Sequence, residues 1–399
     1  MIVRRFLEWS QTAPAGQRAE AASALARAYL YSELEPADRD EALAALAIML
    51  DDGAPPVRRA LAETFASAAD APVHIIISLS NDQSEIAAPV LARSPVLLDS
   101  DLIDSAAIGD AAARLAIAGR ARLSAGVCAA MAEIGEPESL VEMLRNPGAE
   151  IPDFAYRRMI ERHGAEASLR EEMLHRSDLS AGVRHMLVVA VSDALSQFVQ
   201  TCAWMRPERG ERVMAEAREA AAVAIAEKAG DCEALARHLC ASRQLTAGLL
   251  LRALLSGRVA LLEAALSQLS GQPSRRVAGI LSQRRGGGFA ALYRQAGLPQ
   301  GLFRAFDAAI AAWRDLGADG EFANRPAALS RRMIERTLTA LDGECAAENM
   351  KLFALLRRYE AEATREEARA FMAEVVHAPF DELEFEIKRL VDEQAALAA

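Results

Sequence analysis

Aromatic residues and lysine are scarce in this chain of 399 residues. Phe, Trp and Tyr make up only 5% of it, although 52% of its residues are hydrophobic. Lysine occurs only at Lys228, Lys351 and Lys388, so arginine supplies almost all of the positive charge. A dedicated nucleic-acid binder has a basic surface and aromatic side chains that stack on bases, whereas this chain has a net charge of −11. The composition therefore argues against nucleic acid as a partner.

Paired cysteines, a leader signal and long apolar runs are also absent from the sequence. The five cysteines are odd in number and scattered, unlike the disulfide framework of a small secreted protein. Residues 1–8 lack the apolar core of a signal peptide, and no stretch approaches the roughly 20 apolar residues that a spanning helix needs. These absences predict a cytoplasmic protein that has no membrane partner.

Motifs of known catalytic and metal sites are missing as well. The sequence has no G-x-S-x-G elbow and no cysteine-nucleophile signature. Cys232, His238 and Cys240 are the closest Cys/His group, but residues six apart on a helix point to different faces. The glycine-rich run 284–289 lacks the Lys-Ser/Thr ending of a phosphate loop, so we interpret it as a flexible connection, with an anion-binding turn as the alternative. We expect no catalytic, cofactor-binding or metal-ligating residue.

What the chain does have is alanine, leucine and alternating charge, which together favour helix throughout. The phrase LDDGAPPV at 50–57 returns as LSNDQSEI at 79–86 and as LRNPGAEI at 144–151. Each copy is typical of the end of one helix, a turn and the start of the next, and we expect Asp52, Asn81 and Asn146 to accept hydrogen bonds from free N–H groups there. The one strand-like run, 73–77, lies within this register and is interpreted as helix.

Apolar residues after these turns recur at every fourth position, which places them in one stripe on a helix. The clear stripes are Val57/Leu61/Phe65, Ile151/Ala155/Met159 and Val183/Leu187/Val191; weaker ones are Ile86/Val90/Ser94 and Val127/Met131/Gly135. A second phrase, RARLSAGV at 120–127, returns as RSDLSAGV at 176–183 with five consecutive identities. This spacing of 56 residues fits a period of two repeats. Stacked helical hairpins build extended surfaces for binding.

The pattern predicts an all-α chain whose N-terminal half is a HEAT-like α-solenoid, followed by a further region of helical hairpins. We expect capping helices at 1–35, with Phe6, Leu25, Tyr29 and Leu30 covering the first repeat, and the repeat region at 36–204. A second helical region covers 205–316, and a C-terminal helical region with an acidic amphipathic helix covers 317–399. Phe380, Leu383, Ile387 and Leu390 share one face of that last helix.

Several segments resemble a bacterial family, mostly alphaproteobacterial, that is described only as a domain of unknown function. They are IAAPVLARSPVL at 86–97, RARLSAGV at 120–127, LLLRALL at 249–255 and ALYRQAGLP at 291–299. The resemblance spans about residues 1–316. It implies HEAT-like helical repeats and an interaction role, and it brings no catalytic residues with it.

Arginine pairs provide the candidate partner-binding residues. Arg58-Arg59 and Arg157-Arg158 fall on helices expected to line the concave side, where they could form a basic stripe for an acidic partner. The alternative is a solvated face whose arginines pair with neighbours such as Glu63 and Glu161. Residues 359–399 hold eleven acidic and four basic side chains, so the terminal helix is a candidate partner for such a basic stripe, either within the same chain or in another copy through self-association.

We therefore expect a non-enzymatic α-helical repeat protein that acts as a scaffold or adaptor for an unidentified protein partner. A first alternative is a HEAT-like nucleic-acid-binding protein with a basic concave face, which salt-sensitive binding to duplex DNA would reveal. A second alternative is a HEAT-like lyase-type enzyme, whose sign would be a concave pocket lined by Asp, Arg and aromatic residues. Trp204 and Trp313 are the residues to inspect for such a pocket, and otherwise we expect both to be packing residues.

Overall fold

The computed structural model describes residues 9, 12–202, 204–228, 230–283, 287–318, 325–341 and 350–377. Within them the chain is all-α, with a single isolated bridge between Leu123 and Ala149 and no strand, which confirms the predicted fold class. The chain divides into two compact units, Met1–Ala194 and Leu195–Ala399, and the division falls within one helix. Nowhere in the described ranges does a helix combine the length and hydropathy that crossing a bilayer requires.

The first unit consists of short helices joined by short turns. They are α2 (Ala15–Tyr31), α3 (Pro36–Met49), α4 (Pro55–Phe65), α5 (Val73–Ser80), α6 (Ser84–Arg93), α7 (Asp99–Ile108), α8 (Ala111–Ala118), α9 (Ala125–Ile134), α10 (Pro137–Arg145), α11 (Asp153–His163), α12 (Ala167–His175) and the start of α13 (Ala181–Thr201). The strand-like run 73–77 is indeed helical, as part of α5. Ile75 and Ile76 are buried in the core of this unit, whereas Ile77 is 40% exposed, so tertiary packing of two isoleucines outweighs the preference of the run for a strand.

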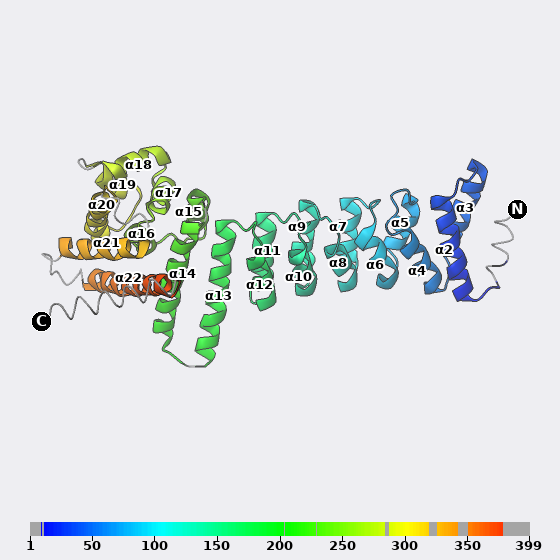
Figure 1. Ribbon diagram of the computed structural model, residues 1–399, viewed down its shortest axis with the longest axis horizontal. Coiled ribbons are helices and arrows are strands. Elements are labelled where there is room, and N and C mark those ends of the chain that lie inside the picture. The colour runs from blue at the N-terminus through cyan, green and yellow to red at the C-terminus, as the bar shows by residue number, and fades with distance from the viewer. Residues whose placement is uncertain are drawn as a thin grey trace, which may run out of the picture. The chain divides into compact units, whose positions relative to one another are not determined.

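The helices of this unit lie in two layers (Figure 1). Each even-numbered helix from α2 to α12 packs on the next even-numbered one, and α7, α9 and α11 pack on one another in the same way. We call these the even layer and the odd layer. A lone helical hairpin would leave its apolar stripe in water, so the stripes are buried only because neighbouring hairpins cover one another.

The predicted stripes form this core. Val57, Leu61 and Phe65 are completely buried, and the stripes that begin at Ile86, Val127 and Ile151 are buried along their length. The exception is the last member of the stripe on α13. Val183 and Leu187 are buried, but Val191 is 43% exposed.

The repeated phrases mark turns without specifying the layer that follows. The copies at 50–57 and 79–86 connect an odd helix to the next even one, whereas the copy at 144–151 connects α10 to α11. The phrases at 120–127 and 176–183 both connect an even helix to an odd one. The three copies of the first phrase are therefore not in one structural register, although each ends one helix and starts another.

The entry segment packs as predicted where it is described. Tyr29 of α2 is 7% exposed and contacts the ring of Phe65 edge-on, with 6.5 Å between the ring centroids. Leu25 and Leu30 are half-buried against the same core. Phe6 lies outside the described residues.

The second unit is built around α16. Its helices are the end of α13, α14 (Pro207–Lys228), α15 (Cys232–Ala241), α16 (Ala247–Leu255), α17 (Val259–Ser270), α18 (Ser274–Ser282), α19 (Gly288–Gln295), the 3-10 turn η1 (Gln300–Leu302), α20 (Phe303–Ala318), α21 (Pro326–Leu341) and α22 (Met350–His377). α16 contacts α14, α17, α20 and α21, and all residues from 249 to 255 are buried.

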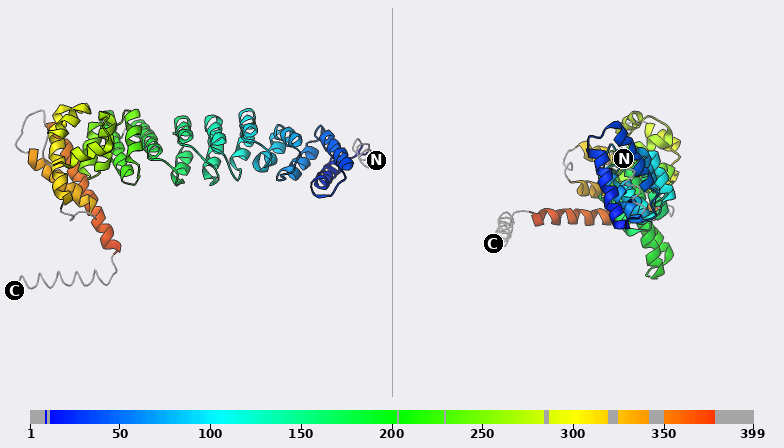
Figure 2. Two further views of the ribbon diagram at one scale, coloured as in Figure 1. Left: turned by 90° about the horizontal axis from the view of Figure 1, so that it is seen from above. Right: turned by 90° about the vertical axis from the view of Figure 1, so that its right-hand side faces the viewer.

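The last described helix, α22, extends its C-terminal part away from the other helices of this unit (Figure 2). The predicted acidic face of Phe380, Leu383, Ile387 and Leu390 lies outside the described residues. Trp204 was expected to pack inside the protein, but its side chain is 70% exposed and contacts Phe198 edge-on at 5.5 Å.

Candidate functional site

A ladder of ion pairs follows the even layer. Arg18 of α2 binds Asp52 in the turn before α4 with two hydrogen bonds of 2.8 Å. Arg58 of α4 binds Asp82 in the turn before α6 at 2.6 Å. Arg114 of α8 binds Glu136, the residue before α10, at 2.5 Å. In each case an arginine fastens its helix to the turn that starts the next helix of the same layer.

The same turns show how the repeated phrase works. Asp52 accepts a hydrogen bond from the N–H of Ala54 at 2.8 Å, and Asn146 accepts one from the N–H of Gly148 at 2.8 Å. Both donors lie in the turn and not in the first turn of the next helix, where the sequence had placed them, so these side chains shape the turn without capping the helix. Asn81 behaves differently, because its side chain donates back to the carbonyl of Ile77. Its neighbour Asp82 accepts from the N–H of Gln83 at 2.7 Å instead.

The first predicted arginine pair lies on α4 in the even layer. Arg58 is a member of the ladder: its side chain is only 18% exposed and also donates to the carbonyl of Asp52. Arg59 is exposed and binds Glu63, one turn further along α4, at 2.9 Å.

The second predicted pair lies on α11 in the odd layer. Arg158 binds Glu133 of α9 with two hydrogen bonds of 2.6 and 2.8 Å and contacts Glu161 at 3.3 Å. Arg157 lies 3.9 Å from Asp153. The structure therefore does not bring the two pairs together into one stripe, and all four arginines have acidic neighbours.

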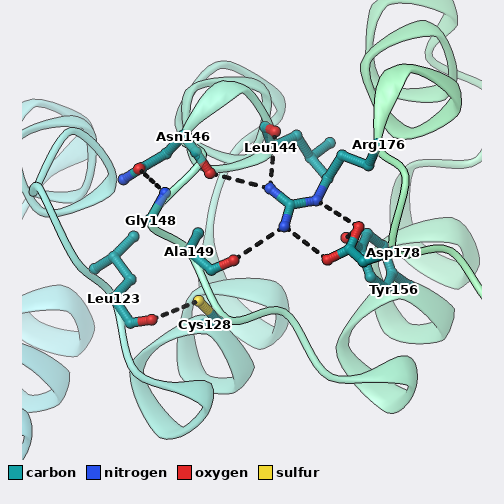
Figure 3. Close-up of polar contacts among 9 residues, drawn as sticks. All are labelled: Leu123, Cys128, Leu144, Asn146, Gly148, Ala149, Tyr156, Arg176 and Asp178. Atoms are coloured by element: carbon teal, nitrogen blue, oxygen red, sulfur yellow. Dashed lines mark hydrogen bonds and ion pairs between the residues drawn. The ribbon is translucent and has the colours of Figure 1, made fainter.

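The second repeated phrase has an arginine at its start that ties a turn to the preceding hairpin (Figure 3). Arg176 donates to the carbonyls of Leu144 at 3.2 Å, Asn146 at 3.0 Å and Ala149 at 3.0 Å, and forms an ion pair with Asp178 at 2.7 Å. Arg120, 56 residues earlier, donates to the carbonyls of Leu91 and Ser94 at the end of α6. A helix ends in unpaired carbonyls with partial negative charge, which a guanidinium satisfies.

We call Arg176 and the groups that it binds the Arg176 joint. Figure 3 shows two further residues beside it, Tyr156 and Cys128. Tyr156 donates its hydroxyl hydrogen bond to Asp178 at 3.0 Å. Cys128 is fully buried, and burial raises the pKa of its thiol to about 12, so the thiol stays protonated at neutral pH. The Arg176 joint connects the turn between α12 and α13 to the turn between α10 and α11. The protonated thiol of Cys128 is not poised as a nucleophile.

The ion pairs of the ladder and of the Arg176 joint predict that the stability of the fold depends on pH. The hydrogen bond from Arg18 lowers the pKa of Asp52, the one from Arg114 lowers that of Glu136, and the one from Arg176 lowers that of Asp178. Carboxylates with a lowered folded-state pKa contribute stability above their unfolded value of about 4, and that stability is lost as the pH falls through the folded value. We expect the urea midpoint of the full chain to fall steeply between pH 5 and pH 3.

The matched control for that titration is the double variant Asp52→Asn/Asp178→Asn. It should be less stable at pH 7 and should lose less stability between pH 5 and pH 3. Equal losses in the variant and the unmodified chain would contradict the assignment of these carboxylates.

Large apolar side chains are exposed at the starts of several odd-numbered helices of the first unit. Val73 starts α5 and is 57% exposed, Leu98 precedes α7 and is 68% exposed, and Phe154 in the first turn of α11 is 62% exposed. Each even helix returns the chain, so successive odd helices run in one direction and their first turns share one edge of the layer. We call Val73, Leu98 and Phe154 the edge row. Asp99 and Asp153 lie in the same first turns.

A second candidate site surrounds Arg252 in the second unit. Arg252 lies in the middle of the buried helix α16, and its side chain is only 8% exposed. Its two terminal nitrogens donate to Glu362 of α22 at 3.2 and 2.7 Å, and its guanidinium lies 4.5 Å from the ring centre of Tyr359. The Nε atom is buried and has no hydrogen-bond partner in the part of the chain that the structure describes. Burial raises the pKa of Tyr359 to about 12.

Two cavities adjoin this ion pair. One, of about 190 Å³, lies among α14, α16, α21 and α22 and includes Glu227, Arg258, Ser256 and Ser330 in its lining. The other, of about 450 Å³, lies between α14 and α22 and includes Glu216, Arg358, Arg365 and Arg369. Both cavities are lined by Ala220, Arg252, Glu362 and Glu366. We call the two together the Arg252 cleft.

Sequence reasoning did not single out the Arg252 cleft, although a signal was present. An arginine within LLLRALL is surrounded by leucine on every face of a helix, which places the charge in the interior unless an acidic partner meets it. The partner, Glu362, lies 110 residues away, so no local pattern identifies it.

The other candidates contribute no site in the described part of the chain. No group of three or more His, Cys, Asp or Glu side chains that could hold a metal ion is found among the described residues. Cys232 donates to the carbonyl of Ala226, and Cys240 is exposed. In the glycine-rich run, residues 284–286 lie outside the described residues. Neither Trp204 nor Trp313 lines the Arg252 cleft.

Comparison with known proteins gives one match. The model of the family described as "Uncharacterised protein conserved in bacteria (DUF2336)" matches residues 86–343, which is more than half of the chain. The match begins at α6 and extends past α21, so it starts later and ends later than the span of 1–316 expected from the resembling segments. No curated protein and no solved structure matches the chain.

Proposed function

The chain belongs to DUF2336, a family of uncharacterised proteins conserved in bacteria, and we propose that it is a non-enzymatic scaffold that binds a protein partner through the first unit. The partner docks on the edge row. Its docking surface carries apolar side chains flanked by lysine or arginine.

The edge row is the observation that carries this proposal. Folded proteins rarely leave large apolar side chains exposed in a group unless they serve an interface. Here three such side chains, each more than half exposed, occur at the start of an odd-numbered helix or directly before it. The aspartates beside them, Asp99 and Asp153, favour a basic rim on the partner.

The contacts of the arginines also favour a protein partner over nucleic acid. A protein that grips a phosphate backbone needs guanidinium groups free to contact it. Arg58 and Arg158 instead bind carboxylates within the array, and Arg120 and Arg176 cover helix ends. These four arginines thus hold successive hairpins together and are not free to contact phosphates.

The edge row predicts where a partner can be crosslinked. A photoreactive residue placed at Phe154 of the full-length protein should form an adduct with one protein in the native cell. The same residue placed at Leu115, which is 45% exposed in the even layer, should not form that adduct. An identical adduct from both positions would contradict docking on the odd layer.

A substitution pair completes the test. We expect Leu98→Glu/Phe154→Glu to reduce recovery of the crosslinked partner at least ~10-fold, because apolar anchors supply most of the energy of an interface. The control pair, Leu115→Glu/Leu174→Glu, adds the same charges at exposed positions of the even layer. Both pairs should leave the melting temperature nearly unchanged, since all four side chains are exposed.

A further inference from the structure

The charges that line the Arg252 cleft do not all find partners. Arg258 binds Glu227, Arg358 binds Glu216, and Arg252 binds Glu362. Arg365 and Arg369 also line the larger cavity, and among the described residues neither forms an ion pair. Since α22 places residues three or four positions apart on one face, both guanidinium groups lie on the side of the helix that faces the cavity.

The remaining carboxyl group of the lining is that of Glu366. Burial and the negative charge of Glu362 raise its pKa, while Arg252 and Arg369 lower it, so Glu366 interacts with the same arginines that an entering anion would meet. Four arginines and three glutamates line the larger cavity, so positive charge is in excess there.

Arg252 adds an unmet hydrogen-bond donor. Its side chain is more than nine-tenths buried. Its terminal nitrogens bind Glu362, but Nε has no acceptor among the described residues. A buried donor without an acceptor is unfavourable and rare in folded proteins. Arg252 lines both cavities, so an anion entering the cleft reaches the neighbourhood of this group.

We propose that the Arg252 cleft binds a small phosphate-bearing molecule, held by Arg365 and Arg369 and approached by Arg252. The planar fork of an arginine matches the oxygens of a phosphate in pairs, which a single ammonium cannot do. The cavity of about 450 Å³ has the size of sites for small ligands and is too small for a folded partner. Ala217, Ala220 and Ala361 form the apolar part of its lining. This proposal is independent of the edge row, because the two sites lie in different units.

The test uses the full-length protein and pyrophosphate as the probe. Isothermal titration should show saturable binding of pyrophosphate, and the melting temperature should rise with pyrophosphate but not with sodium chloride at the same ionic strength. Arg365→Gln/Arg369→Gln should weaken the binding at least ~10-fold, because it removes both unpaired guanidinium groups. The control, Arg332→Gln/Arg336→Gln, removes equal charge from exposed positions of α21 and should leave Kd unchanged.

A third variant distinguishes a ligand site from a structural network of charges. Glu366→Gln removes the carboxyl group that competes for the same arginines, so pyrophosphate should bind about 2- to 10-fold more tightly. A group with only a structural role would not improve binding when it is replaced.

Several results would overturn the proposal. One is the absence of saturable pyrophosphate binding. Another is an equal rise of the melting temperature in sodium chloride at the same ionic strength. Unchanged affinity in Arg365→Gln/Arg369→Gln, or weaker binding in Glu366→Gln, would do the same. Binding of a phosphorylated peptide without any binding of pyrophosphate would also overturn it, because the site would then recognise a peptide chain.

Discussion

Replacing Arg176 by alanine is expected to lower the free energy of unfolding of the first unit by about 3 kcal/mol. The guanidinium is 13% exposed and donates to three backbone carbonyls as well as to Asp178. Its removal takes a charged donor from the carbonyls of Leu144 and Ala149, leaves the carbonyl of Asn146 with the N–H of Ala149, and removes the ion pair of Asp178. Urea denaturation followed by circular dichroism measures the loss.

Hydrogen exchange shows where the Arg176→Ala effect occurs. Protection should fall first in α10 and α11, the helices whose connecting turn Arg176 holds. The matched control is Arg157→Ala, because Arg157 is about half exposed and lies 3.9 Å from its acidic neighbour. If the two variants have the same urea midpoint, Arg176 does not fasten the hairpins.

Placing a carboxylate at Val183 is expected to have a still larger effect. Val183 is completely buried at the start of α13 and belongs to the hydrophobic core of the first unit. An aspartate at this position would have apolar neighbours in its stripe and no cation there to pair with. A buried charge without a partner costs several kcal/mol, so Val183→Asp should lose about 4 kcal/mol or more and unfold much of the first unit. Because hairpins in such an array support one another, the loss should extend beyond α13.

The same stripe supplies the control for Val183→Asp. Val191 has the same residue type on the same helix face, but it is 43% exposed. Val191→Asp should therefore change the melting temperature little. Comparable melting curves for the two variants would contradict the burial that distinguishes them, and Val183→Ile would then serve to test whether the pocket accepts added volume.

Much of the secondary structure was predictable because its signals are local. The stripe of Val57, Leu61 and Phe65 is a property of spacing along the chain, and it is buried as the period of a helix requires. The stripe on α13 shows the limit of this reasoning. Its spacing is equally regular, but Val191 is 43% exposed, and whether a residue of a stripe is covered depends on the helices that pack against it.

The candidate sites were much less predictable. Arg58 and Arg158 were visible as members of arginine pairs, but their roles depend on Asp82 and Glu133, which lie 24 and 25 residues away in sequence. The edge row was not predicted, since an exposed Val, Leu or Phe looks like a core residue in sequence. Only the orientation of α5, α7 and α11 places those side chains on one edge.

The sequence by itself determined that this chain forms helices, where most of them turn, and which faces are apolar, because these follow from residues within one or two helical turns of each other. The tertiary structure alone decided which arginines are consumed in ion pairs, that Arg252 meets Glu362, and which apolar side chains stay in water. Those outcomes depend on the packing of distant helices, and the energy of a charge or an exposed apolar group is set by the neighbours that packing supplies.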